Sequence, residues 1–270
     1  MVIVKLYGGL GNQMFQHAAG AVLAEKLGTK LYHDLSWFDF VKTKPHATQR
    51  SFELDQFGIA PRTLSFFAKR QAAKLPVYSQ SGLGYDSGFT KISGSVILDG
   101  HWQSYRYFEN SPDLIKKVFS FPTLENEELS EQITSKPSIS LHIRRGDYAS
   151  NTTINAIHGL LPKQYYEKGV AKLANELENP HLFLFSDDIA WVKQNFKFNH
   201  PSTFIKSRRD IDDMHLMSLC RCNIIANSSF SWWAAWLNAN SGKQVVAPKK
   251  WSIDPNYKYP ELIPKDWIIL

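Results

Sequence analysis

The 270-residue chain has only two cysteines, and other features that mark particular classes of protein are missing as well. Cys220 and Cys222 have only His215 near them in sequence, whereas a structural zinc site needs about four ligands. Reduced thiols in a cytosolic protein are therefore expected. No apolar run approaches the ~20 residues of a membrane-spanning helix, and the first residues lack the basic start and apolar core of a signal peptide. These absences favour a cytoplasmic location.

A basic block or tail is also missing, although the net charge is +6 and the pI is about 9.1. This charge allows an anionic partner such as a nucleotide, a nucleic acid or a membrane surface. A nucleic-acid-binding protein is one alternative, but no motif that combines basic and aromatic residues supports it. The most basic amphipathic stretch is residues 61–76, "PRTLSFFAKRQAAKLP". It predicts a solvated helix face with Leu64, Phe66 and Phe67 packed inward; the alternative is peripheral contact with the inner face of a membrane.

The patterns that are present alternate between strand and helix. In the N-terminal half we expect a strand "VIVKLYG", a helix over 12–27 and a second strand that runs into a loop within "KLYHDLSWF". Another strand is expected in "SVILDG". Residues 122–137 are polar and acidic, which predicts a surface helix joining two halves. In the C-terminal half the expected strands are 138–143, 181–186, 203–207, 223–228 and 244–248, and the expected helices are 163–177, 188–195, 210–220 and 229–239. This alternation predicts an α/β protein with parallel sheets of the Rossmann type.

Polar residues follow three of the expected C-terminal strands, at the edge where ligands bind in such sheets. The first group is "HIRRGDY", residues 142–148. Arg144 and Arg145 form a natural clamp for a diphosphate because a guanidinium is always charged and binds phosphate oxygens in pairs. Asp147 either tethers one of these arginines or acts on the substrate. The alternative for the whole group is a surface ion pair.

The second and third groups each allow two interpretations. In "SDD", residues 186–188, Ser186 or Asp187 caps the next helix, or the carboxylates chelate Mg²⁺. The metal interpretation is of the kind in which a carboxylate pair holds Mg²⁺ on a nucleotide sugar. In "ANSSFSWWAAWL", Asn227, Ser228 and Ser229 lie where a strand turns into a helix. They form either an anion site at the positive end of that helix or a simple cap.

The glycine-rich turn near the N-terminus, "YGGLGNQMFQ", matches neither common phosphate loop. Gly9 and Gly11 fit the first two glycines of a dinucleotide fingerprint, but Met14 occupies the third position. No Gly-Lys-Ser/Thr sequence follows, which excludes a Walker loop. The arginine group offers phosphate a better site, so this turn is expected to contact a neutral sugar.

Together, "GGLGNQMFQHAAG", "HIRRGDY", "SDD" and "NSSFSWW" resemble the bacterial α-1,2-fucosyltransferases, family 11 of the glycosyltransferases. The motifs span residues 8–233, whereas 40–95 carries no recognised motif. The resemblance implies a GT-B-type fold in which two Rossmann-like α/β domains face a cleft. Residues 1–125 would form the acceptor-side domain with the glycine turn, and 126–270 the GDP-fucose-binding domain.

The resemblance also implies roles for individual residues. By similarity to α-1,6- and protein O-fucosyltransferases, His142 and Arg144 would touch the nucleotide and its β-phosphate, Arg145 would assist, and Asp213 would read guanine. Phosphate-binding residues and residues near the fucose would complete the donor site; they are Asn227, Ser228, Ser229, Phe230, Gly11, Asn12 and Gln13. The α-1,6 enzymes have a Glu soon after their arginines, where this chain has "ASNTT". Asp147 and His158 are therefore alternative candidates for the catalytic base.

The implied reaction transfers fucose with inversion from GDP-β-L-fucose to the 2-hydroxyl of a terminal β-galactose on a glycan. The resemblance implies no metal and no other cofactor. A competing hypothesis is a metal-dependent glycosyltransferase of the GT-A type that uses the "SDD" carboxylates. The negative charge that grows on GDP would be held by arginine and helix N–H groups instead. The expected partners are thus GDP-fucose and a galactose-terminated glycan, and the expected enzyme is a galactoside 2-α-L-fucosyltransferase.

Overall fold

The computed structural model describes residues 1–44 and 48–270, and it divides into two compact α/β units. Unit 1 contains Met1–Pro122 and Lys258–Pro264; unit 2 contains Thr123–Tyr257 and Lys265–Leu270. The chain thus returns to unit 1 for a short segment near its end, which the expected division at residue 125 did not include. Residues 45–47, inside the stretch without a recognised motif, lie outside the described residues.

Unit 1 is built on a parallel sheet with the strand order β2-β1-β4-β3. Its strands are β1 (Val2–Lys5), β2 (Leu31–Asp34), β3 (Val77–Ser79) and β4 (Val96–Asp99). Its helices are α1 (Leu10–Lys26), α2 (Ser36–Lys42), α3 (Phe66–Ala72) and α4 (Pro112–Val118), with 3₁₀ turns η1 (Leu54–Phe57), η2 (Ser87–Lys91) and η3 (Tyr105–Tyr107). Met14, Phe15 and Leu23 of α1 are fully buried, so this helix provides much of the core of the unit.

Unit 2 has a longer parallel sheet, with the strand order β10-β9-β8-β5-β6-β7. Its strands are β5 (Ser138–Ile143), β6 (His181–Ser186), β7 (Ser202–Phe204), β8 (Cys222–Ile224), β9 (Gln244–Ala247) and β10 (Ile268–Ile269). Its helices are α5 (Glu127–Thr134), α6 (Gly146–Ser150), α7 (Thr152–His158), α8 (Lys163–Ala174), α9 (Ile189–Asn195), α10 (Asp210–Leu219) and α11 (Ser229–Leu237). Cys220 and Cys222 are buried free thiols.

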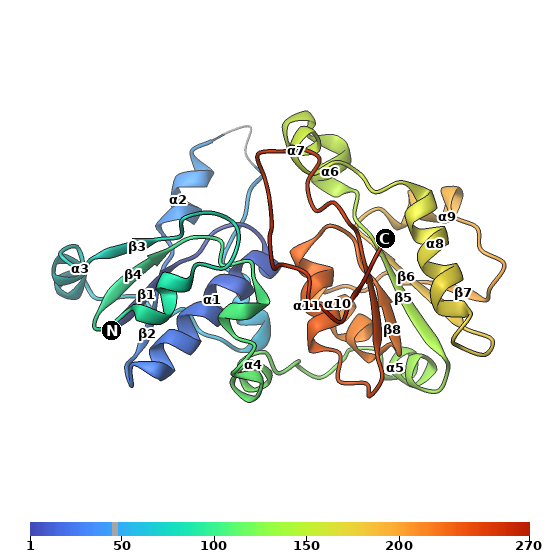
Figure 1. Ribbon diagram of the computed structural model, residues 1–270, viewed down its shortest axis with the longest axis horizontal. Coiled ribbons are helices and arrows are strands. Elements are labelled where there is room, and N and C mark those ends of the chain that lie inside the picture. Colours follow the sequence, from blue (N-terminus) through green and yellow to red (C-terminus); the bar gives the residue numbers. More distant parts are fainter. Residues whose placement is uncertain (45–47) are drawn as a thin grey trace. The chain divides into compact units, whose positions relative to one another are not determined.

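The central strand β5 is buried along its whole length because helices cover both faces of the sheet (Figure 1). Ile139 and Leu141 belong to the core that includes residues of α8 and α9. On the opposite face, Ser140 accepts a hydrogen bond from Asn223, which also bonds the Met217 carbonyl of α10. Side chains that follow β5 therefore emerge between these two layers of helices.

The two all-parallel α/β units confirm the predicted fold class, while the cleft between them stays a prediction. β5 and β6 span the residues expected for them. The loop expected after the second strand is a helix instead, because β2 ends at Asp34 and "SWF" begins α2. Within the described residues, no helix combines the length and apolar character needed to cross a membrane.

Candidate active site

The two arginines after β5 form the centre of a charged cluster, which we call the arginine loop (residues 144–147). Arg144 is paired with Asp147 (Nη2–Oδ1, 2.6 Å) and with Asp187 (Nη1–Oδ2, 2.9 Å). Its side chain is only 21% exposed. Burial alone would lower the pKa of Arg144, but the carboxylates of Asp187 and Asp147 raise it above its ordinary value. The guanidinium is thus held charged and in place before any ligand arrives.

Arg145 is oriented by the residues that follow the neighbouring strand, β6. Its Nε donates to Asp188 (3.1 Å), and its guanidinium stacks on the ring of Trp191 at 3.5 Å from the centroid. Its backbone N–H donates to Asp187 Oδ1 at 2.8 Å. Asp187 therefore contacts both arginines, through the side chain of Arg144 and the backbone of Arg145.

The "SDD" group caps a helix and also pairs with the arginines. Asp188 caps α9 by accepting from the Trp191 N–H (3.2 Å), so the prediction that Ser186 or Asp187 is the cap is wrong. Ser186 instead ties β6 to β5 by donating to the Ile143 carbonyl (2.7 Å). The two carboxylates pair with arginines, and no group of three or more possible metal ligands occurs among the described residues.

Gly146 shows how closely Asp187 approaches the arginine loop. A Cβ atom placed on Gly146 would lie 2.4 Å from Asp187 Oδ2, which is closer than such atoms can come. Register explains the meeting, because Ile143 is the pairing partner of Ser186 and the residues after both strands share one edge of the sheet. Sequence reasoning missed this role of Asp187, although two polar groups after adjacent expected strands were a usable signal.

His142 lies at the end of β5 and is buried, with its ring 5.8 Å from that of Phe230 on α11. Its Nδ1 atom has no hydrogen-bond partner among the described residues. Burial lowers the pKa of His142 to about 4; Asp187 opposes this shift and Arg144 adds to it. The imidazole is therefore neutral at pH 7. A buried polar atom without a partner is rare and calls for an explanation, for which a bound ligand is one candidate.

His158 belongs to the same electrostatic cluster. Its ring stacks on Tyr148 with centroids 4.8 Å apart and an interplanar angle of 6°. Burial lowers its pKa, Asp147 raises it and Arg144 lowers it further. Asn227 holds this region in place, because its side chain donates to the His158 carbonyl (2.9 Å) and its own carbonyl accepts from the Tyr148 hydroxyl (3.1 Å). The side-chain N–H₂ of Asn227 thus braces the site.

The start of α11 is the third predicted element of the site. Ser228 is the residue before the helix, and its side chain makes no capping hydrogen bond. The simple-cap interpretation therefore does not explain its presence. The N–H groups of a first helical turn can bind an anion when no side chain caps them.

Asp213 lies on α10 and stands apart from the contacts of the arginine loop. Its Oδ1 is buried without a hydrogen-bond partner in the part of the chain that the structure describes. Burial raises the pKa of Asp213 to about 6, against hydrogen bonds from Ser207 that lower it. A partly desolvated carboxylate of this kind has the chemistry to accept hydrogen bonds from a ligand.

The predicted residues of the glycine turn, here the glycine loop (residues 8–13), are in unit 1. Gln13 is fully buried; its Nε2 donates to the carbonyls of Gly8 (2.9 Å) and Ser51 (2.8 Å), and its Oε1 accepts from the Glu53 N–H (2.9 Å). Both of its amide hydrogens are used internally, so Gln13 supports the loop instead of contacting a sugar as expected. Asn12 is partly exposed and accepts from Gln103 (2.8 Å).

The glycine loop also carries an internal anion that the sequence did not reveal. Glu53 accepts from the Leu10 N–H at the first residue of α1 (Oε2, 2.8 Å). A carboxylate at this position occupies the site that a phosphate would take at a helix N-terminus. This agrees with the expectation that phosphate binds elsewhere.

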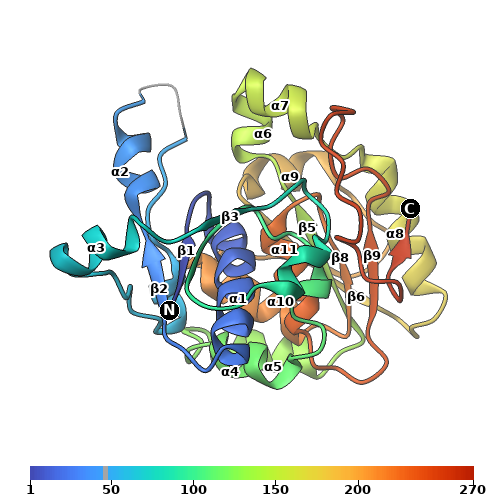
Figure 2. The ribbon, with the colours of Figure 1, turned by 60° about the vertical axis from the view of Figure 1, so that its left-hand side comes forward.

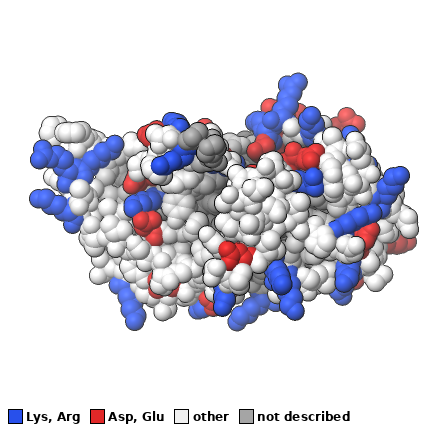
Figure 3. Space-filling view, turned by 90° about the horizontal axis from the view of Figure 1, so that it is seen from above, with Lys and Arg blue, Asp and Glu red and all other residues white. Residues whose placement is uncertain are grey.

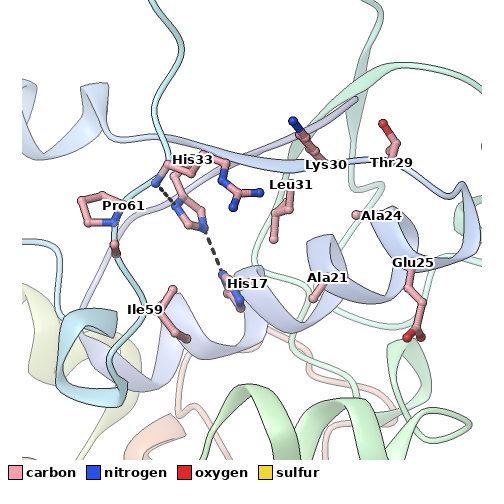
Figure 4. A pocket seen from close by; sticks show the side chains of 12 residues that line it. His17, Ala21, Ala24, Glu25, Thr29, Lys30, Leu31, His33, Ile59 and Pro61 are labelled. Carbon is pink, nitrogen blue, oxygen red and sulfur yellow. Dashed lines mark hydrogen bonds between the residues drawn. The ribbon is translucent and has the colours of Figure 1, made fainter.

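Each unit contains a cavity. One of about 230 Å³ adjoins the arginine loop, with Arg144, Arg145, Lys163 and Trp191 in its wall. The other, of about 650 Å³, lies in unit 1 and contains no predicted site residue. Its wall includes a buried histidine pair in which His17 Nδ1 and His33 Nε2 are 3.0 Å apart (Figure 4). Apolar side chains form much of the remainder of that wall.

Comparison with known proteins gives consistent results. The family described as glycosyl transferase family 11 matches residues 83–270. The chain is 33% identical to an α-1,2-colitosyltransferase of Escherichia coli, over 99% of this chain and 98% of that one. It is 23% identical to a galactoside 2-α-L-fucosyltransferase of Bos taurus, over 88% of this chain and 64% of the other. A solved structure of NodZ α-1,6-fucosyltransferase soaked with GDP-fucose has a TM-score of 0.47 at 15% identity, covering 87% of this chain and 92% of that chain.

The family match includes the arginine loop, the carboxylates after β6 and the start of α11, while the colitosyltransferase alignment extends over nearly the whole chain, glycine loop included. The chain is a member of glycosyltransferase family 11.

Proposed function

We propose that this glycosyltransferase moves L-fucose from GDP-β-L-fucose to the 2-hydroxyl of a terminal β-galactose on a glycan, with inversion. The observation that carries the proposal is the pre-positioned Arg144, which is held by Asp147 and Asp187 and whose charge acts on the buried His142. Family membership adds to it, and the mammalian relative bears the name of this activity.

The charges of the arginine loop suggest how Arg144 would act. Arg144 and Arg145 carry two positive charges, whereas Asp147, Asp187 and Asp188 carry three negative ones. The arginine loop together with Asp187 and Asp188 is therefore not a strongly positive site, and a diphosphate must compete with carboxylates for Arg144. Asp187 contacts Nη1 and Asp147 contacts Nη2, so Arg144 would exchange Asp147 for the β-phosphate while Asp187 keeps the guanidinium oriented.

This exchange would also supply a base. Once Arg144 binds phosphate, Asp147 no longer pairs with its guanidinium and is a candidate to take the proton of the acceptor hydroxyl. His158, neutral because of burial, is the second candidate for the same role. Substituting Asp147→Asn and His158→Gln separately, and measuring turnover against pH, distinguishes them. The variant that lacks the base loses the acidic limb of the profile.

Asp213 would read the guanine base, because the N1–H and 2-amino groups of guanine are donors and its Oδ1 is an unpartnered acceptor. Asp213→Asn should weaken GDP binding and favour xanthosine diphosphate, which has a carbonyl in place of the 2-amino group. The matched control is Asp210→Asn, on an exposed position of the same helix. Wild-type GDP affinity should fall below pH 6 as the carboxyl group protonates. An Asp213→Asn variant with unchanged preference would remove Asp213 from the site.

The decisive assay offers GDP-fucose to a panel of galactosides, followed by linkage analysis of the product. Calorimetry should show GDP binding far more tightly than UDP or CMP, and equal affinity for UDP would overturn the donor assignment. A second donor deserves a place in the panel, since the bacterial relative is named a colitosyltransferase. Colitose is L-fucose without the 3-hydroxyl. A higher kcat/KM with GDP-colitose than with GDP-fucose would mean that colitose is the sugar transferred, and the rest of the proposal would stand.

A further inference from the structure

Helix α3 of unit 1 presents its large apolar side chains outward, which reverses the expectation from sequence. Phe66 is 72% exposed and Phe67 is 79% exposed, so the prediction that both pack inward is wrong. The inward positions are taken by small residues: Ala72 is buried and Ala68 half-buried, one helical turn apart. The physical reason is that the short helix (seven residues) contacts its unit through alanine methyl groups. Both phenylalanine rings are left in water.

Cations surround these rings. Lys69 and Arg70 lie three and four positions after Phe66, which places them on the same side of the helix. From residue 56 to residue 85 the sequence contains Arg62, Lys69, Arg70 and Lys74 and no acidic residue. None of these four takes part in an ion pair among the described residues. Figure 3 shows Lys and Arg gathered in blue at the left-hand end of the view, where α3 lies in Figure 1.

We propose that Phe66, Phe67, Lys69, Arg70 and Lys74, the α3 surface, dock this protein on an anionic lipid bilayer. Aromatic rings that enter the acyl boundary, with cations beside them at the level of the phosphates, are the combination that interfacial helices use. Figures 1 and 2 both show α3 projecting at an edge of unit 1, a shape suited to a flat membrane.

Other occupants fit this surface less well. In a symmetric dimer built on the α3 surface, identical cationic patches would face each other, and like charges oppose such a contact. Two rings on one short helix also offer far less area than the roughly 800 Å² per partner of a stable protein interface. A lipid surface needs neither shape complementarity nor a large contact area. The inference is independent of the proposed donor and acceptor.

Vesicle co-sedimentation of the full chain tests the proposal. Wild type should bind vesicles of phosphatidylglycerol mixed with phosphatidylcholine and not phosphatidylcholine alone. Binding should be lost in ~1 M salt, where the Debye length falls to about 3 Å. Lys69→Gln with Arg70→Gln should weaken binding about 25-fold, at about 5-fold for each cation. Phe66→Ser with Phe67→Ser should weaken it by about 10-fold or more.

Matched controls keep the test specific. Lys116→Gln with Lys117→Gln removes two exposed cations from α4, and Phe40→Ser removes another exposed phenylalanine from α2. These controls should bind vesicles like wild type. All variants should keep their melting temperature, because the substituted side chains are exposed, and should transfer sugar to a soluble acceptor as wild type does. That last measurement separates this inference from the proposed function.

The proposal is overturned if wild type ignores the anionic vesicles, or if the control variants lose as much binding as the α3 variants. Sedimentation velocity tests the rival occupant. A wild-type dimer that Phe66→Ser with Phe67→Ser converts to a monomer, without vesicle binding, would assign the surface to a second copy of the chain.

Discussion

The glycine loop of unit 1 and the arginine loop of unit 2 occupy equivalent places, since each follows a buried parallel strand and opens a helix. Both are strand-to-helix turns that contain glycine, yet charged side chains are arranged differently around them. At the glycine loop, Glu53 occupies the helix N-terminus, and the amide of Gln13 is buried in the loop itself. At the arginine loop the internal carboxylates hold guanidinium groups that are still partly exposed. Glycine at a strand end thus shows that something approaches the backbone, without showing what.

In each loop one glycine shows which group approaches the backbone. A Cβ on Gly9 would lie 3.3 Å from Nη1 of Arg50, and one on Gly146 would lie 2.4 Å from Asp187 Oδ2. In both loops a glycine admits a charged side chain from a distant segment. The first loop admits an arginine and the second a carboxylate, so the two loops differ in the charges that pack against them more than in their backbone design.

We expect the arginine loop to take part in the reaction, so substitution of Arg144 should give the largest effect. Arg144→Ala and Arg144→Lys should each lower turnover about 10²–10³-fold, or ~3–4 kcal/mol, because a forked donor to the leaving diphosphate is lost. Arg106→Lys is the control, since Arg106 has a comparable ion pair with Glu261 at 2.6 Å in unit 1. Its turnover should equal that of wild type. A Lys variant of Arg144 with normal turnover would refute the bidentate role.

Substitution in the glycine loop should lower the free energy of unfolding much more than it lowers turnover. Gln13→Ala leaves two carbonyls and one N–H without their partner in a buried place, which should cost about 3 kcal/mol of unfolding free energy. At a temperature where the variant stays folded, transfer should fall by less than about 10-fold, because ~1.4 kcal/mol is tenfold in rate. Urea unfolding and initial rates check both. A stable variant with a 100-fold loss of turnover would show that the Gln13 amide contacts the donor.

The parts of the fold that sequence could predict are those with strong local patterns. β5 and β6 are continuous apolar runs, and the expected residues match. Helices α6 and α7 were missed because "GDYASNTTINAIH" has no apolar period; Asn151 caps α7, and Asn227 fixes its end at His158. Phe66 and Phe67 were wrongly predicted for the opposite reason. The apolar pattern predicted that their rings pack in the core, but it is alanine side chains of α3 that face the unit.

The candidate site shows the same division. Arginines after a strand could be recognised from residue type and position, since guanidinium chemistry is local to the side chain. The pairing of Glu53 with the Leu10 N–H could not, because it joins segments about 43 residues apart that no pattern links. The pairing of Asp187 with Arg144 also joins distant segments, and predicting it required placing the two expected strands side by side. Trp191, which stacks on Arg145, was likewise hidden in an ordinary helix.

Acidification should lower the stability of the protein through the buried pair of histidines, His17 and His33, in unit 1. The Arg62 N–H donates to His33 Nδ1, so His33 carries its proton on Nε2 and donates it to His17 Nδ1. Burial and their mutual repulsion lower the pKa of His17 to about 3; burial and Arg62 lower that of His33 to about 4. The unfolded chain takes up protons near pH 6.5, before the folded one does. Stability is therefore present above pH 6.5 and falls as the pH drops towards 4.

For this pair the loss should be roughly 2 kcal/mol on going from pH 7 to pH 5.5. Urea unfolding of wild type and His17→Gln at both pH values measures it. The variant should show the smaller pH dependence, whatever its stability at pH 7. His142→Gln provides the comparison in unit 2, where the pKa of the histidine is lowered in the same direction. Equal pH dependence in wild type and His17→Gln would mean that the pair is not titrating on unfolding.

Chelation should produce the smallest effect, namely none. Dialysis against EDTA is expected to leave turnover unchanged, because guanidinium groups are placed to carry the charge that a divalent cation would otherwise neutralise. A cation held by Asp187 and Asp188 would have to displace Arg144 and Arg145 from contacts of 2.9 and 3.1 Å, which would undo the orientation of both arginines.

The variant Asp187→Asn tests the same expectation without a chelator. This variant removes the carboxylate charge that orients Arg144 but keeps an oxygen to accept from the Arg145 N–H. Its turnover should fall because Arg144 is no longer held in place. Added Mg²⁺ or Mn²⁺ should not restore it. If EDTA abolishes turnover of wild type and either metal restores it, then Asp187 and Asp188 are metal ligands. In that case the carboxylates at the arginine loop do not serve to orient the two arginines.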